Sequence, residues 1–318
     1  MFFKMMLLSF RGISVVFITG IGGYLIISGL KPNRQYMDFI SKLIIRIALP
    51  CLMFYTLATK FTIEDVEFWW VYPLMAVAIN LAGASLAYAY MFFDNTVKRR
   101  GEFGVLVAFQ NGVFLPLAFA PVFFDSGTLP YFLNILFLYN LLSVPTFFTL
   151  AVWMVNRSGG INIRLRDFIN PPIVATVLGL IFAIFGWGAY VPEIVIKPIA
   201  AMGTLATPLS MFFVGGVIVT NIPKAKAVDW RDAVKITLLK SLAFPLLVCL
   251  VVLIVRPPEY VGLLLILESV MPSALMIALI APDDGVSHKI IAGALLLTYL
   301  ISIITIPLFM GVYGALYG

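Results

Sequence analysis

The sequence predicts an all-α polytopic membrane protein, with ten transmembrane helices arranged as two inverted five-helix repeats. The 318 residues are 62% hydrophobic and only 11% charged, whereas soluble domains carry about 25% charged residues. The mean hydropathy is +1.06. Apolar stretches of about 20 residues, enough to cross a bilayer, recur along the whole chain. Two of these stretches, one in each half, are interrupted by a proline near the middle.

Lys4 and Arg11 precede the first apolar run, so the N-terminus superficially resembles a signal peptide. No small-residue cleavage site follows, and the run continues to Leu30, so we interpret it as the first span. The connections between spans are short, and no soluble domain is inserted. The expected spans are, in order, about 12–30, 36–58, 68–93, 102–124, 130–156, 168–188, 194–220, 229–255, 259–281 and 288–316.

The basic residues predict the orientation of the spans. With both termini outside, sixteen of the 21 Lys and Arg residues fall in cytoplasmic loops or adjoining helix ends, as the positive-inside rule expects. The net charge of +6 is scattered between spans, which indicates a multi-pass protein of the plasma membrane, embedded in the lipid bilayer, and not a nucleic-acid-binding protein. Cys51 and Cys249 lie inside apolar spans and show neither disulfide nor metal spacing, so no metal site or cofactor is expected.

The two halves of the chain resemble each other. Pro50–Phe54 (PCLMF) is similar to Pro208–Phe212 (PLSMF), and each half later has a mid-span proline, Pro116 or Pro272. Because five spans is an odd number, the copies must enter the membrane from opposite faces. Inverted repeats with a broken helix in each copy are typical of secondary transporters. The expected repeats are residues 1–156 and 157–318.

The fourth span carries the first interruption, Gln110-Asn111-Gly112 followed by Pro116. Proline removes a helical hydrogen bond and clashes with the preceding turn, and Gly and Asn weaken the same place. We therefore expect two half-helices that meet near mid-membrane. Non-helical backbone at that depth survives only where protein buries it or where it lines a watery cavity.

The ninth span carries the second interruption, at Glu268-Ser269-Val270-Met271-Pro272-Ser273. Inverted symmetry predicts that the two interruptions cross in the middle of the membrane. We expect each second half-helix to begin at its proline, a favoured first helical residue. The two half-helix N-termini would then attract an anion, and the free carbonyls that end the first halves would suit a cation or a proton donor.

Three motifs resemble the auxin efflux carrier family, in particular its prokaryotic branch. They are Asn111–Ala118 (NGVFLPLA), Met271–Ala274 (MPSA) and Leu297–Pro307 (LTYLISIITIP). The resemblance implies export of organic anions such as carboxylates, whether auxin-like or dicarboxylate. It also implies a crossover fold like that of bile-acid and sodium/proton carriers, moving by an elevator mechanism. Helices 1, 2, 6 and 7 would form the scaffold, and helices 3–5 and 8–10 the transport part.

Several side chains are candidates for the substrate site. The Asn111 amide would bind the substrate or cap the freed backbone, and Lys240 would neutralise a carboxylate or pair with Glu268. The alternatives are purely structural: helix kinks at the prolines, and interhelical hydrogen bonds for the polar residues of spans 3, 5 and 10. The expected substrate-binding residues are Asn111, Gly112, Pro116, Tyr139, Asn140, Pro272, Ser273 and Lys240.

Glu268 is the one acid expected deep within a span, at the carboxyl end of a half-helix where the dipole disfavours negative charge. It is therefore a candidate for coupling to Na⁺ or H⁺, together with the adjacent Ser269, and Na⁺ near Glu268 is the one metal ion considered. The alternative is a structural ion pair with a basic neighbour. Intramembrane ionisable groups are functional candidates by default.

The sequence thus favours a secondary transporter of small organic anions, with a homodimer as the expected assembly. The alternative is a sodium/proton antiporter or cation-coupled carrier with Glu268 as its ion site. An intramembrane enzyme ranks below both, because the spans carry no paired aspartates, Ser-His set or metal cluster. A receptor or structural membrane protein is the remaining alternative.

Overall fold

The computed structural model describes residues 1–29, 34–62, 68–156, 170–221, 230–275, 277 and 285–317. Within these ranges all regular elements are helical, and extended backbone pairs at one isolated bridge, between Gln110 and Ser273. The predicted all-α class is therefore confirmed.

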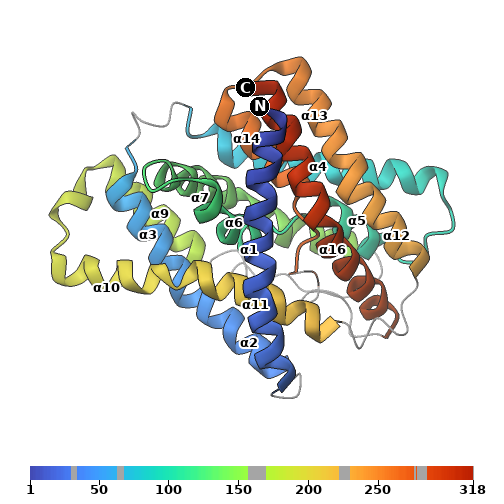
Figure 1. Ribbon diagram of the computed structural model, residues 1–318, viewed down its shortest axis with the longest axis horizontal. Coiled ribbons are helices and arrows are strands. Elements are labelled where there is room, and N and C mark those ends of the chain that lie inside the picture. Colours follow the sequence, from blue (N-terminus) through green and yellow to red (C-terminus); the bar gives the residue numbers. More distant parts are fainter. Residues whose placement is uncertain are drawn as a thin grey trace.

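The helices follow the expected order of spans (Figure 1). Three of them contain a five-residue π-helical turn (η1, η2 and η6), and η4 is a 3₁₀ turn. The bounds are α1 Phe2–Gly29, α2 Arg34–Leu43, η1 Ile44–Ala48, α3 Leu49–Lys60, α4 Val71–Phe93, α5 Arg100–Ala108, α6 Phe114–Phe123, α7 Leu129–Thr146, η2 Phe147–Ala151, α8 Val152–Asn156, α9 Pro171–Ile184, η4 Trp187–Tyr190, α10 Glu193–Thr204, α11 Ala206–Asn221, α12 Trp230–Leu238, η6 Leu239–Ala243, α13 Phe244–Val255, α14 Glu259–Val270 and α16 Gly285–Tyr317.

Seven helical stretches in the described residues are long and apolar enough to cross a membrane. They coincide with expected spans 1, 2, 3, 5, 7, 8 and 10. In place of the sixth span the structure has α9, an apolar helix of 14 residues. The fourth and ninth expected spans are the interrupted ones, so neither forms one long helix.

Two expected boundaries are wrong. The first helix begins at Phe2 and not near residue 12, because residues 2–11 contain no proline or glycine that would stop it. The second half of the fourth span begins at Phe114 and not at Pro116. Proline is tolerated there because the first four N–H groups of a helix have no intrahelical partner in any case.

Two groups of helices pack around the interrupted segments (Figure 1). On one side α3 packs against α9 and α10, and α11 packs against α1. On the other side α4 packs against α5 and α7, while α16 packs against α12 and α14. The helix α1 lies along α16 as well, with the two ends of the chain close together. The interrupted segments lie between these groups, and every residue from Gly101 to Ala108 in α5 is buried.

The π turns η1 and η6 each precede a proline. Pro50 and Pro245 are the second residues of α3 and α13. A proline ring clashes with the carbonyl four residues earlier, which here belongs to Arg46 or Ser241. Widening the preceding turn to a π-helix relieves that clash, and such turns occur frequently at functional sites.

The glycines of the first helix make a contact within the chain. A Cβ added at Gly23 would lie 2.4 Å from the carbonyl oxygen of Phe212 in α11, whereas one added at Gly22 would meet nothing within 4 Å. Gly23 therefore allows α1 and α11 to approach closely. The expected homodimer remains a prediction.

Candidate functional site

The two interruptions bind each other through their backbones. After α5 ends at Ala108 and α14 at Val270, the chain runs extended in both segments. The N–H of Asn111 donates to the carbonyl of Pro272 at 2.8 Å, and the N–H of Ala274 donates to the carbonyl of Phe109 at 3.0 Å. These two bonds form a short antiparallel bridge at the centre of the helical bundle. The interruptions therefore meet, as the sequence predicts.

Polar side chains satisfy the backbone groups that the interruptions leave unpaired. The Asn140 amide donates to the carbonyl of Gly112 and to that of Leu136, both at 2.8 Å. The Ser273 hydroxyl donates to the carbonyl of Leu106 at 2.6 Å, near the end of α5. Unpaired carbonyls are costly away from water. Asn140 and Ser273 therefore have a structural role, whatever else they do.

Asn111 fixes the start of α6. Its Oδ1 accepts at 3.2 Å from the N–H of Phe114, the first residue of α6, although the N-cap itself is Val113. Its Nδ2 donates to the hydroxyl of Tyr299 in α16 at 2.6 Å. Among the described residues, no acceptor pairs with the N–H groups of Gly112, Val113 or Leu115. The start of α6 thus carries free donors and the positive end of the helix dipole.

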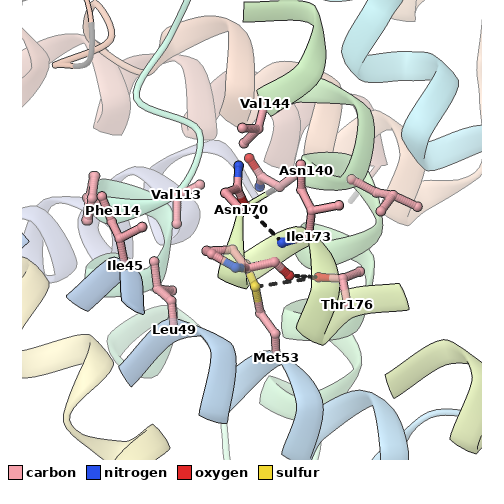
Figure 2. A pocket seen from close by; sticks show the side chains of 12 residues that line it. Ile45, Leu49, Met53, Val113, Phe114, Asn140, Val144, Asn170, Ile173 and Thr176 are labelled. Atoms are coloured by element: carbon pink, nitrogen blue, oxygen red, sulfur yellow. Dashed lines mark hydrogen bonds between the residues drawn. The ribbon is translucent and has the colours of Figure 1, made fainter. Parts of the chain in front are cut away.

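A cavity lies beside this helix start (Figure 2). It has a volume of about 60 Å³ and lies between α6 and α7 on one side and η1, α3 and α9 on the other. Its walls are mainly apolar, and Asn140 and Asn170 are its two amide side chains (Figure 2). The lining residues are Ile45, Leu49, Met53, Val113, Phe114, Asn140, Leu141, Val144, Asn170, Pro172, Ile173 and Thr176.

A second, more polar cavity adjoins the first and borders the bridge itself. The two cavities share Val113, Phe114, Asn140 and Val144. The second is also lined by Phe109, Gln110, Asn111, Gly112, Ser143, Phe147, Ala274 and Leu275. The two cavities therefore lie next to each other, with more polar lining at the interruptions and apolar lining toward α3 and α9.

Asn170 was not predicted as a site residue. It is the N-cap of α9, where its Oδ1 accepts from the N–H of Ile173 at 3.0 Å. Asn followed by Pro171 and Pro172 is a recognisable start signal for a helix. That signal identifies the cap but gives no indication of a cavity beside it.

Behind the cavities lies a layer of buried polar groups. Gln110 donates from its side-chain nitrogen to the hydroxyl of Tyr139. Glu268 and Lys240 are both 0% exposed, and their charges interact. A Cβ added at Gly112 would lie 2.6 Å from Glu268 Oε2. The Gly112 backbone therefore separates the polar cavity from the Glu268 carboxylate.

The structure brings three of the ten predicted site residues into the cavities: Asn111, Gly112 and Asn140. The other seven line neither cavity. Ser269 donates to the carbonyl of Ile266 within its own helix at 2.8 Å. The remaining six are Pro116, Tyr139, Pro272, Ser273, Lys240 and Glu268.

Two polar residues of α16 donate hydrogen bonds within their own helix. Thr298 donates to the carbonyl of Ala294 at 2.8 Å, and Ser302 to that of Tyr299 at 2.6 Å. Both bonds lie within one helix and not between helices, because a hydroxyl near the backbone readily reaches a carbonyl three or four residues earlier. In α16 it is Tyr299 that bonds the first interruption.

An ion pair holds α12 beside the loop that leads into α5. Lys235 Nζ donates to Asp94 Oδ2 at 2.6 Å and to the Thr96 hydroxyl at 2.8 Å. The bond from Lys235, followed by those that Thr96 and Tyr90 donate to Asp94, holds the pKa of Asp94 well below its ordinary value. Lys240 follows five residues later along the same continuous helix.

In the part of the chain that the structure describes, no three His, Cys, Asp or Glu side chains converge to form a metal site. Glu268 is the one buried carboxylate at the interruptions. Among the residues that the structure describes, it is the one acidic group next to the residues that line the cavities.

Comparison with known proteins places these features in a family. The sequence model of the family described as "Membrane transport protein" matches residues 11–163 and 156–310. An uncharacterized transporter of Methanothermobacter thermautotrophicus is 22% identical over 307 residues, which cover 93% of this chain and 95% of that protein. Both matches extend over nearly all of the sequence.

Proposed function

The chain belongs to the membrane transport protein family, to which the auxin efflux carriers belong. We propose that it is a secondary transporter of small organic anions. The carrier exports carboxylates across the plasma membrane, with both termini outside. One observation carries the proposal: a cavity opens at the start of α6, where the N–H groups of Gly112 and Val113 have no protein acceptor among the described residues. Free donors at a helix N-terminus suit a carboxylate.

The proposed architecture is a ten-helix inverted repeat. The bridge between the two interruptions supports it, because inverted copies place equivalent segments against each other at the pseudo-twofold axis. Residues 1–156 and 157–318 are then the two copies. Expected spans 1, 2, 6 and 7 form the scaffold, and the other spans move past it in an elevator step.

The two adjacent cavities, one more polar and one mainly apolar, support a way for such a substrate to bind. The carboxylate lies near Asn111 and Gly112 in the polar cavity, and the organic body extends into the apolar cavity against Met53 and Ile173. Because the apolar cavity lies between the proposed scaffold and the moving part, a relative shift of the two would change its access. This arrangement favours a monocarboxylate with an apolar body over a dicarboxylate.

Uptake of labelled carboxylates into proteoliposomes tests the proposal. We expect the purified protein to carry an aromatic or branched monocarboxylate, and Val113→Trp to abolish uptake because Val113 lines both cavities. The matched control is Ile254→Trp, on an α13 side chain that is 73% exposed, which should leave uptake unchanged. Failure of the wild-type protein to move any organic anion under any ion gradient would contradict the proposal.

A sodium/proton antiporter is the second candidate, and the complete burial of Glu268 favours it. It predicts Na⁺-driven proton flux with no anion present, abolished by Glu268→Ala. The same liposomes measure this flux with a pH-sensitive dye. Flux without an organic anion would replace the first proposal with the second.

A further inference from the structure

Lys240 is an unusual residue to find fully buried. It lies in the π turn η6 at 0% exposure, and no described residue accepts a hydrogen bond from its Nζ. The ammonium lies 4.8 Å from the centroid of the Phe244 ring, within range of a cation–π interaction. Neither cavity reaches it. Lys240 is therefore placed to act on another buried group and not to contact the substrate.

That group is Glu268. It is also 0% exposed, and neither carboxylate oxygen accepts a hydrogen bond of normal geometry, although Gln110 lies close enough to interact with it. The turn η6 packs against α14, and the charges of Lys240 and Glu268 are close enough to interact, although no ion pair within 4 Å joins these two side chains. An isolated buried charge is very costly, whereas a buried pair can be retained.

In the described parts of the helices that pack against η6, the basic residues other than Lys240 lie at or near helix ends. The turn packs against α4, α5, α12, α13, α14 and α16. Away from their ends, the described parts of these helices carry no acid except Glu268, and no base. Their charged residues at or near the ends are Arg100, Glu102, Arg231, Asp232, Lys235, Glu259, His288 and Lys289.

The position of Glu268 makes its charge important for the substrate. The carboxylate lies directly behind Gly112, and Gly112 lines the polar cavity. An uncompensated negative charge there would repel a carboxylate at the start of α6 and cancel the attraction of its free N–H groups. Some positive charge must therefore balance Glu268 whenever it is ionised.

We propose that the Lys240 ammonium is a built-in counter-cation for Glu268, so that the carrier binds its anion without recruiting Na⁺. The proposal rests on the proposed function, because it assigns the charge balance of that same site. Lys240 and Glu268 are positioning residues. They set the electrostatic potential at Gly112 and do not contact the substrate.

The first test uses the wild-type protein. Its thermal unfolding temperature is measured in sodium, potassium and choline chloride at equal ionic strength, and labelled carboxylate uptake is measured in the same salts. We expect no difference between the salts. A saturable stabilisation by Na⁺ that disappears in Glu268→Gln would overturn the proposal, because a ligand that binds the folded state stabilises it.

The second test compares Lys240→Met, Glu268→Gln and the double variant. Each single variant should lower uptake at least about tenfold, since removing one partner leaves an unbalanced buried group. The double variant should recover uptake above both single variants, because it removes both charges. Losses that simply multiply in the double variant would overturn the pairing.

Lys197→Met and Glu193→Gln are the matched control. They remove an ion pair on α10 whose side chains are 72% and 79% exposed, and uptake should not change. If Lys240→Met fails to fold, the unfolding temperatures of the wild-type protein and of Glu268→Gln in the different salts still test whether Na⁺ binds at Glu268. If the wild-type protein moves no anion at all, the proposed function fails, while the unfolding series still tests for a Na⁺ site.

Discussion

The two interruptions share a backbone design but differ in chemistry. At the first, Asn111 and Gly112 border a cavity and carry no charge. At the second, the helix α14 ends in Glu268, Ser269 and Val270, all between 0% and 1% exposed. One interruption thus presents free N–H donors to an open space, and the other holds a carboxylate sealed behind it.

This difference indicates a division of roles between the two interruptions. A symmetric pair of interruptions would present the same groups twice. Here the first interruption supplies free N–H donors beside a cavity, and the second supplies the charge that lies behind them. Gly112 is the point of contact between them, because Glu268 Oε2 lies against its backbone.

The largest expected effect comes from filling that contact. In Gly112→Ala the added Cβ would lie 2.6 Å from Glu268 Oε2 and 3.6 Å from Tyr139 Cε1. Overpacking typically costs about 1–3 kcal/mol, so we expect a lower unfolding temperature and a loss of nearly all uptake. Gly22→Ala is the control, since its Cβ meets nothing within 4 Å. Unchanged uptake in Gly112→Ala would show that the two interruptions are not in tight contact.

One variant at each interruption tests whether the two interruptions have different roles. Asn111→Ala removes the bonds to the N–H of Phe114 and to Tyr299, and Ser273→Ala removes the bond to Leu106. Each should lower the free energy of unfolding by about 0.5–2 kcal/mol. Only Asn111→Ala should also weaken carboxylate binding, measured by isothermal titration. Equal weakening of binding in both variants would contradict the division.

The smallest effect should come from the ion pair outside the interruptions. Because Lys235 lowers the pKa of Asp94, this pair stabilises the fold above the ordinary pKa of Asp, and the contribution is lost as pH falls through the lowered value. Lys235→Met should slightly lower the unfolding temperature at neutral pH. It should also move the acid-induced loss toward higher pH, while carboxylate affinity stays unchanged. If Lys235→Met weakened carboxylate affinity as much as Asn111→Ala does, the loop between α4 and α5 would have to contribute to the carboxylate site.

The sequence was sufficient to predict the helical membrane class and the positions of both interruptions. Proline, glycine and asparagine act locally on a helix, so Pro116 and Gly112 indicate a break without knowledge of the fold. The sequence does not predict the exact start of α6, because the start depends on the hydrogen bond between Asn111 Oδ1 and the N–H of Phe114. A single hydrogen bond of this kind decides whether the helix begins at Phe114 or at Pro116.

The site was harder to predict, because a cavity forms from segments far apart in the chain. Asn170 and Met53 line it from helices whose sequence shows only a cap and an apolar face. Lys240 was expected to bind substrate or to pair with Glu268, and which of these holds depends on burial. The structure places it at 0% exposure, outside both cavities.

Protection of a thiol at the first interruption is the most direct test of the central claim, that an organic anion binds there. Val113→Cys is made in a background in which Cys51 and Cys249 are replaced by Ala, and its labelling rate by a maleimide is measured with and without a transported carboxylate. We expect the carboxylate to slow labelling at this position and to have no effect on Ile194→Cys, at an α10 side chain that is 84% exposed. Equal labelling of Val113→Cys with and without the carboxylate would contradict it.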